Sequence, residues 1–227
     1  MFAEHGFAAA PVEQIASEAE VSIGTLYRMF PGRKAEIYRA IQEHRGTELI
    51  GTTRAVGMKA WERRADVVDA MLEGLAALVE YLMAHPDYLR MTLHEEPAWG
   101  VAPKRGTTEQ TAMWREGMES TVLGMQHGIA AGLLVDDDPG VMARTLVAMQ
   151  QAHLGYWLED GKRQSRSVVV ARLQRQFLRA FCRPEVLRER ELLSAAAPPE
   201  QAADIRQAST SRATRSGGVA PPARRSQ

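Results

Sequence analysis

The chain has 227 residues, 45% hydrophobic and 25% charged, which is the composition of an ordinary soluble protein with a packed core. Its 28 basic and 28 acidic side chains cancel, so a uniformly basic protein is excluded, and the single cysteine, Cys182, excludes both an intrachain disulfide and a cysteine-rich zinc cluster. No apolar run approaches the roughly 18–20 residues that cross a bilayer, and the N-terminus lacks the features of a secretory signal. We therefore expect a cytoplasmic protein without a membrane segment.

Charge is unevenly distributed along the chain. Residues 1–27 carry four glutamates and no Lys or Arg, whereas residues 28–50 carry five basic and three acidic side chains. Beyond Asp204 there are five arginines and no acid. Positive charge is local, so any contact with a polyanion must also be local.

The segment from Gly6 to Ile41 predicts two short helices joined by a tight turn. In the first helix, apolar residues recur at the spacing of one buried face, and these are Val12, Ile15, Ala16 and Ala19. In the second, Ser22–Met29, the Ser22 hydroxyl is placed to cap the helix N-terminus. With apolar Val21 in the turn itself, the pair is typical of a helix-turn-helix, whose second helix lies in the major groove of DNA.

The second helix and the start of the next carry side chains that suit DNA. Gly24 allows backbone N–H groups to approach a phosphate closely, and Arg28 can bind guanine O6 and N7 or a phosphate. Arg33 and Lys34 are placed to hold phosphates and so fix the register on DNA. The predicted DNA-binding residues are Ser22, Ile23, Gly24, Thr25, Tyr27, Arg28, Arg33 and Lys34.

Helical periodicity continues through the rest of the chain, and no run alternates as a strand does. The first predicted elements are a helix carrying the apolar stripe Val67–Leu82 and a short helix, Asp87–Glu95. A third helix runs from the capping box at Thr107 to about Leu134, and a fourth from the Asp138–Pro139 start signal to about Asp160. A last helix carries the stripe Val169–Phe181 and ends at Pro184. From about Ala195 onward the composition predicts disorder. The fold class is therefore all-α.

Several short segments at the N-terminus also carry a family resemblance. They are Phe2–Phe7, Val12–Ala16, Val21–Tyr27, Phe30–Pro31 and Arg33–Lys34. In order and spacing they resemble the DNA-binding domain of TetR-family transcriptional regulators. The resemblance implies an N-terminal helix-turn-helix bundle followed by a larger antiparallel helical domain for effector binding and dimerisation. It also implies a double-stranded DNA operator, a second copy of the chain and a small-molecule effector as partners.

The resemblance divides the chain into three parts. Residues 1–47 form the DNA-binding domain with a shortened first helix, residues 48–192 the effector-binding and dimerisation domain, and residues 193–227 a disordered basic tail.

The chain departs from the family pattern inside the DNA-binding domain. Pro11 stands where Thr or Ser usually caps the second helix and binds phosphate, and Glu20 stands at a turn position where glycine is usual. A left-handed backbone at Glu20 would cost about 1 kcal/mol. The segment from Gly32 to Ile37 is one residue longer than the commonest form, so either Arg33 or Lys34 could take the phosphate-binding lysine position.

The larger domain offers candidates for an effector pocket. Methionine adapts to irregular shapes and aromatic rings are common in ligand sites, although plain core packing is the alternative for each residue. The candidates are Met83, Met91, Trp99, Trp114, Met118, Met149 and Tyr156.

Residues on the last two predicted helices are candidates for a dimer interface. Small side chains at Ala148, Ala152 and Gly155 leave a narrow face that, with Leu173 and Phe177, could pack against a second subunit. Packing within one chain is the alternative, and the family resemblance favours the dimer.

No nucleophile–base set, phosphate-cradling glycine loop or metal-ligand spacing is found, so the sequence predicts no catalytic residue, metal or cofactor. We expect a homodimeric repressor that a small apolar effector releases from its operator. The alternative is a helical adaptor whose helix-turn-helix contacts protein, since residues 1–50 carry five basic and seven acidic side chains, a net charge of −2.

Overall fold

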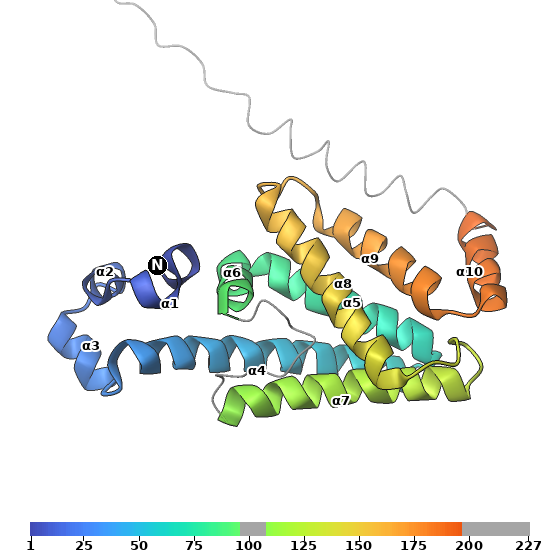
Figure 1. Cartoon of the computed structure of the whole chain (residues 1–227), viewed down its shortest axis with the longest axis horizontal. Coiled ribbons are helices and arrows are strands. Elements are labelled where there is room, and N and C mark those ends of the chain that lie inside the picture. Colours follow the sequence, from blue (N-terminus) through green and yellow to red (C-terminus); the bar gives the residue numbers. More distant parts are fainter. Residues whose placement is uncertain (96–107, 197–227) are drawn as a thin grey trace, which may run out of the picture. The chain divides into compact units, whose positions relative to one another are not determined.

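The computed structural model describes residues 1–95 and 108–196. Within these ranges the secondary structure is helical apart from an isolated β-bridge between Leu134 and Cys182, which confirms the all-α prediction (Figure 1). The helices are α1 (Phe2–Ala9), α2 (Val12–Glu18), α3 (Ile23–Met29), α4 (Arg33–Glu62), α5 (Val67–Ala84), α6 (Pro86–Glu95), α7 (Thr108–Ala130), α8 (Pro139–Glu159), α9 (Arg166–Phe181) and α10 (Pro184–Ala196). None of these described helices is long and apolar enough to pass through a bilayer.

The described part of the chain divides into two units, of which the first ends at Arg183 and the second begins at Pro184. Helices α1 to α9 belong to the first unit and α10 to the second.

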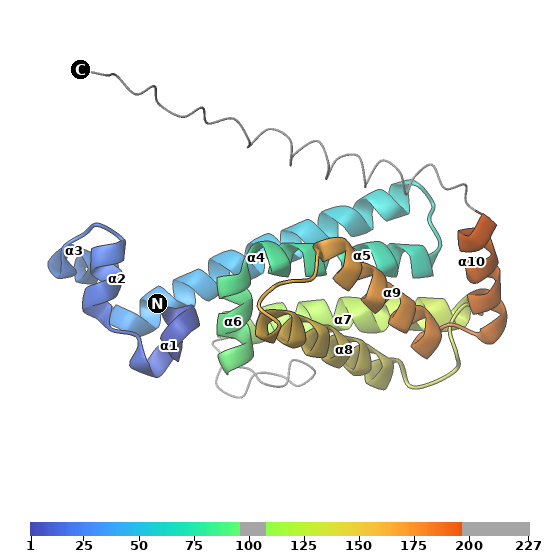
Figure 2. The ribbon, with the colours of Figure 1, turned by 90° about the horizontal axis from the view of Figure 1, so that it is seen from above.

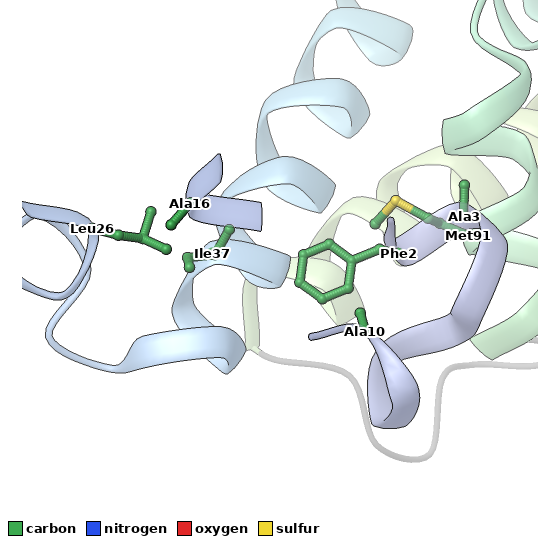
Figure 3. Packing of buried hydrophobic residues seen from close by; sticks show 7 residues of the cluster. All are labelled: Phe2, Ala3, Ala10, Ala16, Leu26, Ile37 and Met91. Atoms are coloured by element: carbon green, nitrogen blue, oxygen red, sulfur yellow. The ribbon is translucent and has the colours of Figure 1, made fainter. Parts of the chain in front are cut away.

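The first three helices enclose a small apolar core that also receives α4 and α6. Phe2 packs edge-on against Tyr38 of α4, with 5.2 Å between ring centroids, and Phe7 packs on the same ring at 5.3 Å. The buried members of this core are Phe2, Ala3, Ala10, Ala16, Leu26, Ile37 and Met91 (Figure 3). The contribution of Met91 means that a residue of α6 helps to pack the DNA-binding bundle.

Helix α4 is a single helix of 30 residues. It therefore continues without a break across positions 47 and 48, where the family resemblance predicts a domain boundary. Its N-terminal part packs in the α1–α3 core through Ile37, and further along it packs against α5 and α7 (Figure 2). One uninterrupted helix thus joins the small bundle to the larger helical part.

Local signals set several helix starts as the sequence predicts. The Ser22 side chain accepts a hydrogen bond from the Thr25 N–H at 3.0 Å, and the Asp138 carboxylate accepts one from the Val141 N–H at 2.8 Å. Pro139 occupies the first turn of α8, where its missing N–H costs nothing.

One predicted helix end is wrong. Helix α7 ends at Ala130 and not near Leu134, because the Leu133 and Leu134 N–H groups both donate to the Gly128 carbonyl and fold the chain back. Gly128 permits this close return, since a Cβ there would lie 2.5 Å from Leu134 Cδ1.

At the C-terminus, the helix with the Val169–Phe181 stripe ends before Pro184, as predicted, but it is not the last helix. Pro184 also starts helix α10, because proline is compatible with a first helical turn. The expected disordered tail from residue 193 overlaps the end of α10, and its remainder, residues 197–227, lies outside the described residues.

Candidate nucleic-acid interface

The turn between α2 and α3 positions one face of α3 in solvent. The Val21 N–H donates to the Ala16 carbonyl at 3.0 Å, which closes the turn and directs Leu26, only 4% exposed, into the core. The opposite face is open. Its members are the exposed Ser22, Ile23, Gly24 and Arg28 and the partly exposed Thr25 and Tyr27. Six of the eight predicted DNA-binding residues therefore lie together on this short helix.

A chain of polar contacts orders this face. Ser22 Oγ lies 2.9 Å from Thr25 Oγ1, and Arg28 Nη2 donates to Thr25 Oγ1 at 3.3 Å. The Arg28 guanidinium is held along the helix, and its remaining N–H groups stay available to a base edge or a phosphate.

The two remaining candidates, Arg33 and Lys34, have different surroundings in the structure. Lys34 Nζ donates to the Ala8 carbonyl at 2.8 Å and to the Ala10 carbonyl at 3.2 Å, and it lies 5.2 Å from the Phe7 ring centroid. Two of its three N–H donors are therefore used by carbonyls at the C-terminal end of α1. The geometry does not support the prediction that Lys34 binds a phosphate.

Arg33 instead lies on the solvent-exposed side of the bundle, next to α3. Its guanidinium carbon lies 5.1 Å from the Tyr27 ring centroid, and its side chain is exposed. Arg33 and Tyr27 thus form one stacked unit beside Arg28 on the solvent face, and of the two cations Arg33 is the better phosphate candidate.

The two departures from the family pattern have structural consequences. Pro11 precedes α2 without any side-chain cap hydrogen bond, so the phosphate-binding hydroxyl usual at that position is missing. Glu20 has φ of 55°, so the backbone at this turn position is left-handed. Its carboxylate is exposed in the turn before α3.

The predicted effector-pocket residues do not gather in one place. Met91 belongs to the α1–α4 core, Tyr156 is 54% exposed, and Met83 is buried on α5. Trp114 and Met118 line one surface groove with Arg144, of about 480 Å³. Met149 is half-buried on α8, and Trp99 lies outside the described residues.

The predicted dimer residues separate into two groups. Ala148 and Ala152 are exposed and Gly155 is partly exposed, all on α8. Leu173 and Phe177 on α9 have no exposed surface within a single chain. Their side chains serve intrachain packing, which removes them from the predicted interface.

A polar joint links α4 to α5. The Tyr81 hydroxyl lies 2.8 Å from Glu48 Oε2 and 3.1 Å from the Arg45 carbonyl, and Arg45 Nη1 donates to Glu48 Oε2 at 2.8 Å. The hydrogen bond from Tyr81 contributes most, and that from Arg45 next, to lowering the pKa of Glu48 below its ordinary value.

A second shifted group lies on α6. Burial raises the pKa of Tyr88 to about 12, so this phenol stays protonated.

A capped and exposed helix, carried on a small bundle and joined by one long helix to a larger helical body, defines a helix-turn-helix DNA-binding regulator. Residues 1–41 match the family model described as bacterial regulatory proteins, tetR family. The match covers residues 1–41 of 227, so it is the helix-turn-helix bundle of this chain that is similar to the N-terminal domain of the family. Among curated proteins, none matches the chain at a significant level.

Solved structures of several regulators share the helical fold over most of the chain. The ketosteroid transcriptional regulator KstR2 of Mycobacterium tuberculosis superposes with a TM-score of 0.67 at 20% identity, over 81% of this chain and 90% of that chain. The TetR-family regulator PfmR from Thermus thermophilus gives 0.64 at 20% identity, over 78% and 92%. SmeT, the repressor of the Stenotrophomonas maltophilia multidrug efflux pump SmeDEF, gives 0.59 at 20% identity, over 82% and 86%.

Proposed function

We propose that this regulator is a homodimeric repressor released from its operator by a small apolar effector. The observation that carries the proposal is the solvent-exposed face of α3, on which Thr25 orients Arg28 while Leu26 anchors the helix from behind. A helix presented in this way can enter the major groove with its N-terminal residues nearest the bases.

Dimerisation supplies the second recognition helix. A two-fold dimer places two copies of α3 at half-sites one helical turn, or a multiple of it, apart. The exposed alanines of α8, Ala148 and Ala152, support an interface there because small side chains let two helices approach closely.

Release by an effector follows from a difference in affinity between two states of the dimer. An effector bound among the helices of residues 48–192 favours the state in which the distance between the two recognition helices does not match the spacing of the operator half-sites. The continuous α4 and the contribution of Met91 to the α1–α4 core provide two physical routes for this coupling.

A mobility-shift assay with the DNA that flanks the gene tests the DNA-binding part of the proposal. Wild type should bind specifically, and its affinity should fall steeply as salt rises, because phosphate contacts release counterions. Arg28→Ala should weaken specific binding by about 1–3 kcal/mol, roughly 5- to 150-fold. Tyr27→Ala should also weaken it, because it removes both the hydroxyl and the ring against which Arg33 stacks.

Arg175→Ala is the matched control, since Arg175 is an exposed arginine on α9. It should leave operator affinity unchanged. Salt-independent or absent binding by wild type would instead support the adaptor function, which the exposed acids Glu13, Glu18 and Glu20 beside α3 favour.

A further inference from the structure

A surface groove lies between α7 and α8, outside the DNA-binding face. Its volume is about 480 Å³, within the range of about 300–1,000 Å³ that small-molecule sites have. The two helices follow one another in the chain and pack together (Figure 1). The apolar lining of the groove is Trp114, Met118, Val122 and Leu123. The groove therefore has the size and the apolar surface that a small organic ligand needs.

The apolar lining forms a strip along α7. Trp114, Met118 and Val122 are spaced by four residues, so they lie in one row on the helix surface. Met118 is only 8% exposed, whereas Trp114 and Val122 are partly buried. Leu123, 51% exposed, lies beside this row. From Trp114 to Val122 the row is roughly 12 Å long at a rise of 1.5 Å per residue, so it suits an elongated ligand.

Three charged side chains border this strip. Arg115 and Glu119 are exposed on α7, and Arg144 is exposed in the second turn of α8. None of the three forms an ion pair with another residue of ranges 1–95 and 108–196. Two arginines and one glutamate leave the groove with a net positive charge, which attracts an anionic group more than a neutral or a cationic one.

Arg144 has free donors for such an anion. Its Nη1 donates to the Gly140 carbonyl at 3.0 Å, which holds the guanidinium beside the start of α8. A Cβ at position 140 would lie only 3.3 Å from this nitrogen, so the glycine leaves room for it. A guanidinium carries five N–H groups, and arginine binds a carboxylate through two parallel hydrogen bonds. Arg144 can therefore keep its bond to Gly140 and still bind a carboxylate.

We propose that the α7–α8 groove is the effector site and that it binds an elongated amphipathic carboxylate. The carboxylate pairs with Arg144, and the apolar chain lies along Trp114, Met118 and Val122. Met118 adapts to the shape of this chain. The ligand would contact α8, the helix that also carries the exposed alanines of the proposed dimer face. This inference rests on the proposed function and specifies the chemical class of its effector.

The first experiment measures ligand selectivity by isothermal titration calorimetry of the full-length protein. The probes are decanoate, 1-decanol and decylammonium, each below its aggregation concentration. Wild type should bind decanoate about three- to tenfold more tightly than 1-decanol, between the values of an exposed ion pair and of a buried charged hydrogen bond. Decylammonium should bind most weakly, and the preference for decanoate should shrink as salt rises. Equal affinities, tightest binding of decylammonium or no binding of any probe would overturn the proposal.

The second experiment locates the site with matched variants. Arg144→Gln should bind decanoate and 1-decanol alike, whereas Arg175→Gln, the same change at an exposed arginine on α9, should keep the preference. Leu123→Ser should weaken both probes equally, and Leu192→Ser, at an exposed leucine of α10, should weaken neither. A preference that survives in Arg144→Gln, or that both arginine variants lose, would place the carboxylate elsewhere and overturn the proposal, and so would equal effects of the two leucine variants.

Operator binding by the same proteins separates this inference from the proposed function. Decanoate at saturation should lower the operator affinity of wild type about tenfold, and by less in Arg144→Gln at the same concentration. An unchanged operator affinity with decanoate bound would overturn the assignment of the groove as effector site. If wild type fails to bind operator DNA while the probe preference holds, the proposed function fails and the ligand site stands. If wild type binds operator DNA while the probe preference is absent, the groove assignment fails and the regulator stands.

Discussion

Two residues of the helix-turn-helix bundle before α3 have a positive φ, and only one of them is glycine. Gly6 has φ of 69° and ψ of 174°, a conformation open almost only to glycine, and it produces the kink inside α1. Glu20 has φ of 55° without the freedom of glycine. The left-handed conformation at Glu20 therefore costs stability in the turn that positions α3.

Glu20→Gly should raise the free energy of unfolding by about 0.5–1 kcal/mol, because relief of the left-handed strain outweighs the greater freedom of glycine in the unfolded chain. Urea denaturation at neutral pH measures the change. Glu20→Ala is the control, since it removes the same charge and keeps a Cβ in the strained conformation. An equal gain in both variants would attribute the effect to charge and not to the backbone.

Among the elements, α4 and α5 meet at the joint formed by Arg45, Glu48 and Tyr81. A carboxyl group whose pKa is lowered by folding stabilises the folded state when it is ionised. For Glu48 this contribution is present above its ordinary pKa of 4.5 and disappears as the pH falls through the lower value that it has in the folded protein. The attachment of α4 to α5 should therefore weaken in acid.

The pH dependence of Glu48→Gln tests this joint. The difference in unfolding free energy between wild type and Glu48→Gln should be constant near neutral pH and should shrink as the pH falls below 4.5. Urea denaturation across this range measures the difference. In a Tyr81→Phe background the pH-dependent part should be smaller, because the hydrogen bond that most lowers the pKa of Glu48 is missing. A difference independent of pH would contradict this role.

For the whole molecule, the exposed face of α8 determines whether two copies can associate. Ala148 and Ala152 are four residues apart on this face, with Val141, 56% exposed, on the same line seven residues before Ala148. A face of small and apolar side chains, with the buried face of α8 on the opposite side, is suited to helix–helix contact with a partner.

Ala152→Glu should prevent dimerisation, because an unpaired charge buried in the interface costs about 3–5 kcal/mol. Sedimentation equilibrium should show a monomer at concentrations where wild type is dimeric, and operator affinity should fall with it. Ala112→Glu, at an exposed alanine on α7, should leave the dimer intact. A dimeric Ala152→Glu protein would exclude this face as the interface.

Features set by neighbouring residues could be predicted from the sequence. The Ser22 and Asp138 caps and the inward position of Leu26 depend on contacts within one or two helical turns, which residue spacing alone reveals. The helical class, the helix-turn-helix and its exposed face could therefore be predicted from residue spacing.

Features set by distant residues could not be predicted in this way. Lys34 donates to carbonyls 24 and 26 residues earlier in the chain. Because Arg33 and Lys34 are neighbours in the sequence, residue spacing could not show that only Lys34 has these partners. Leu173 and Phe177 are covered within their own chain, although their spacing fits a dimer interface equally well. The sequence by itself determined which segments become helices and which face of each is apolar, because those depend on local spacing. Only the tertiary structure decided what each face meets, because burial and pairing arise from segments that are far apart along the chain.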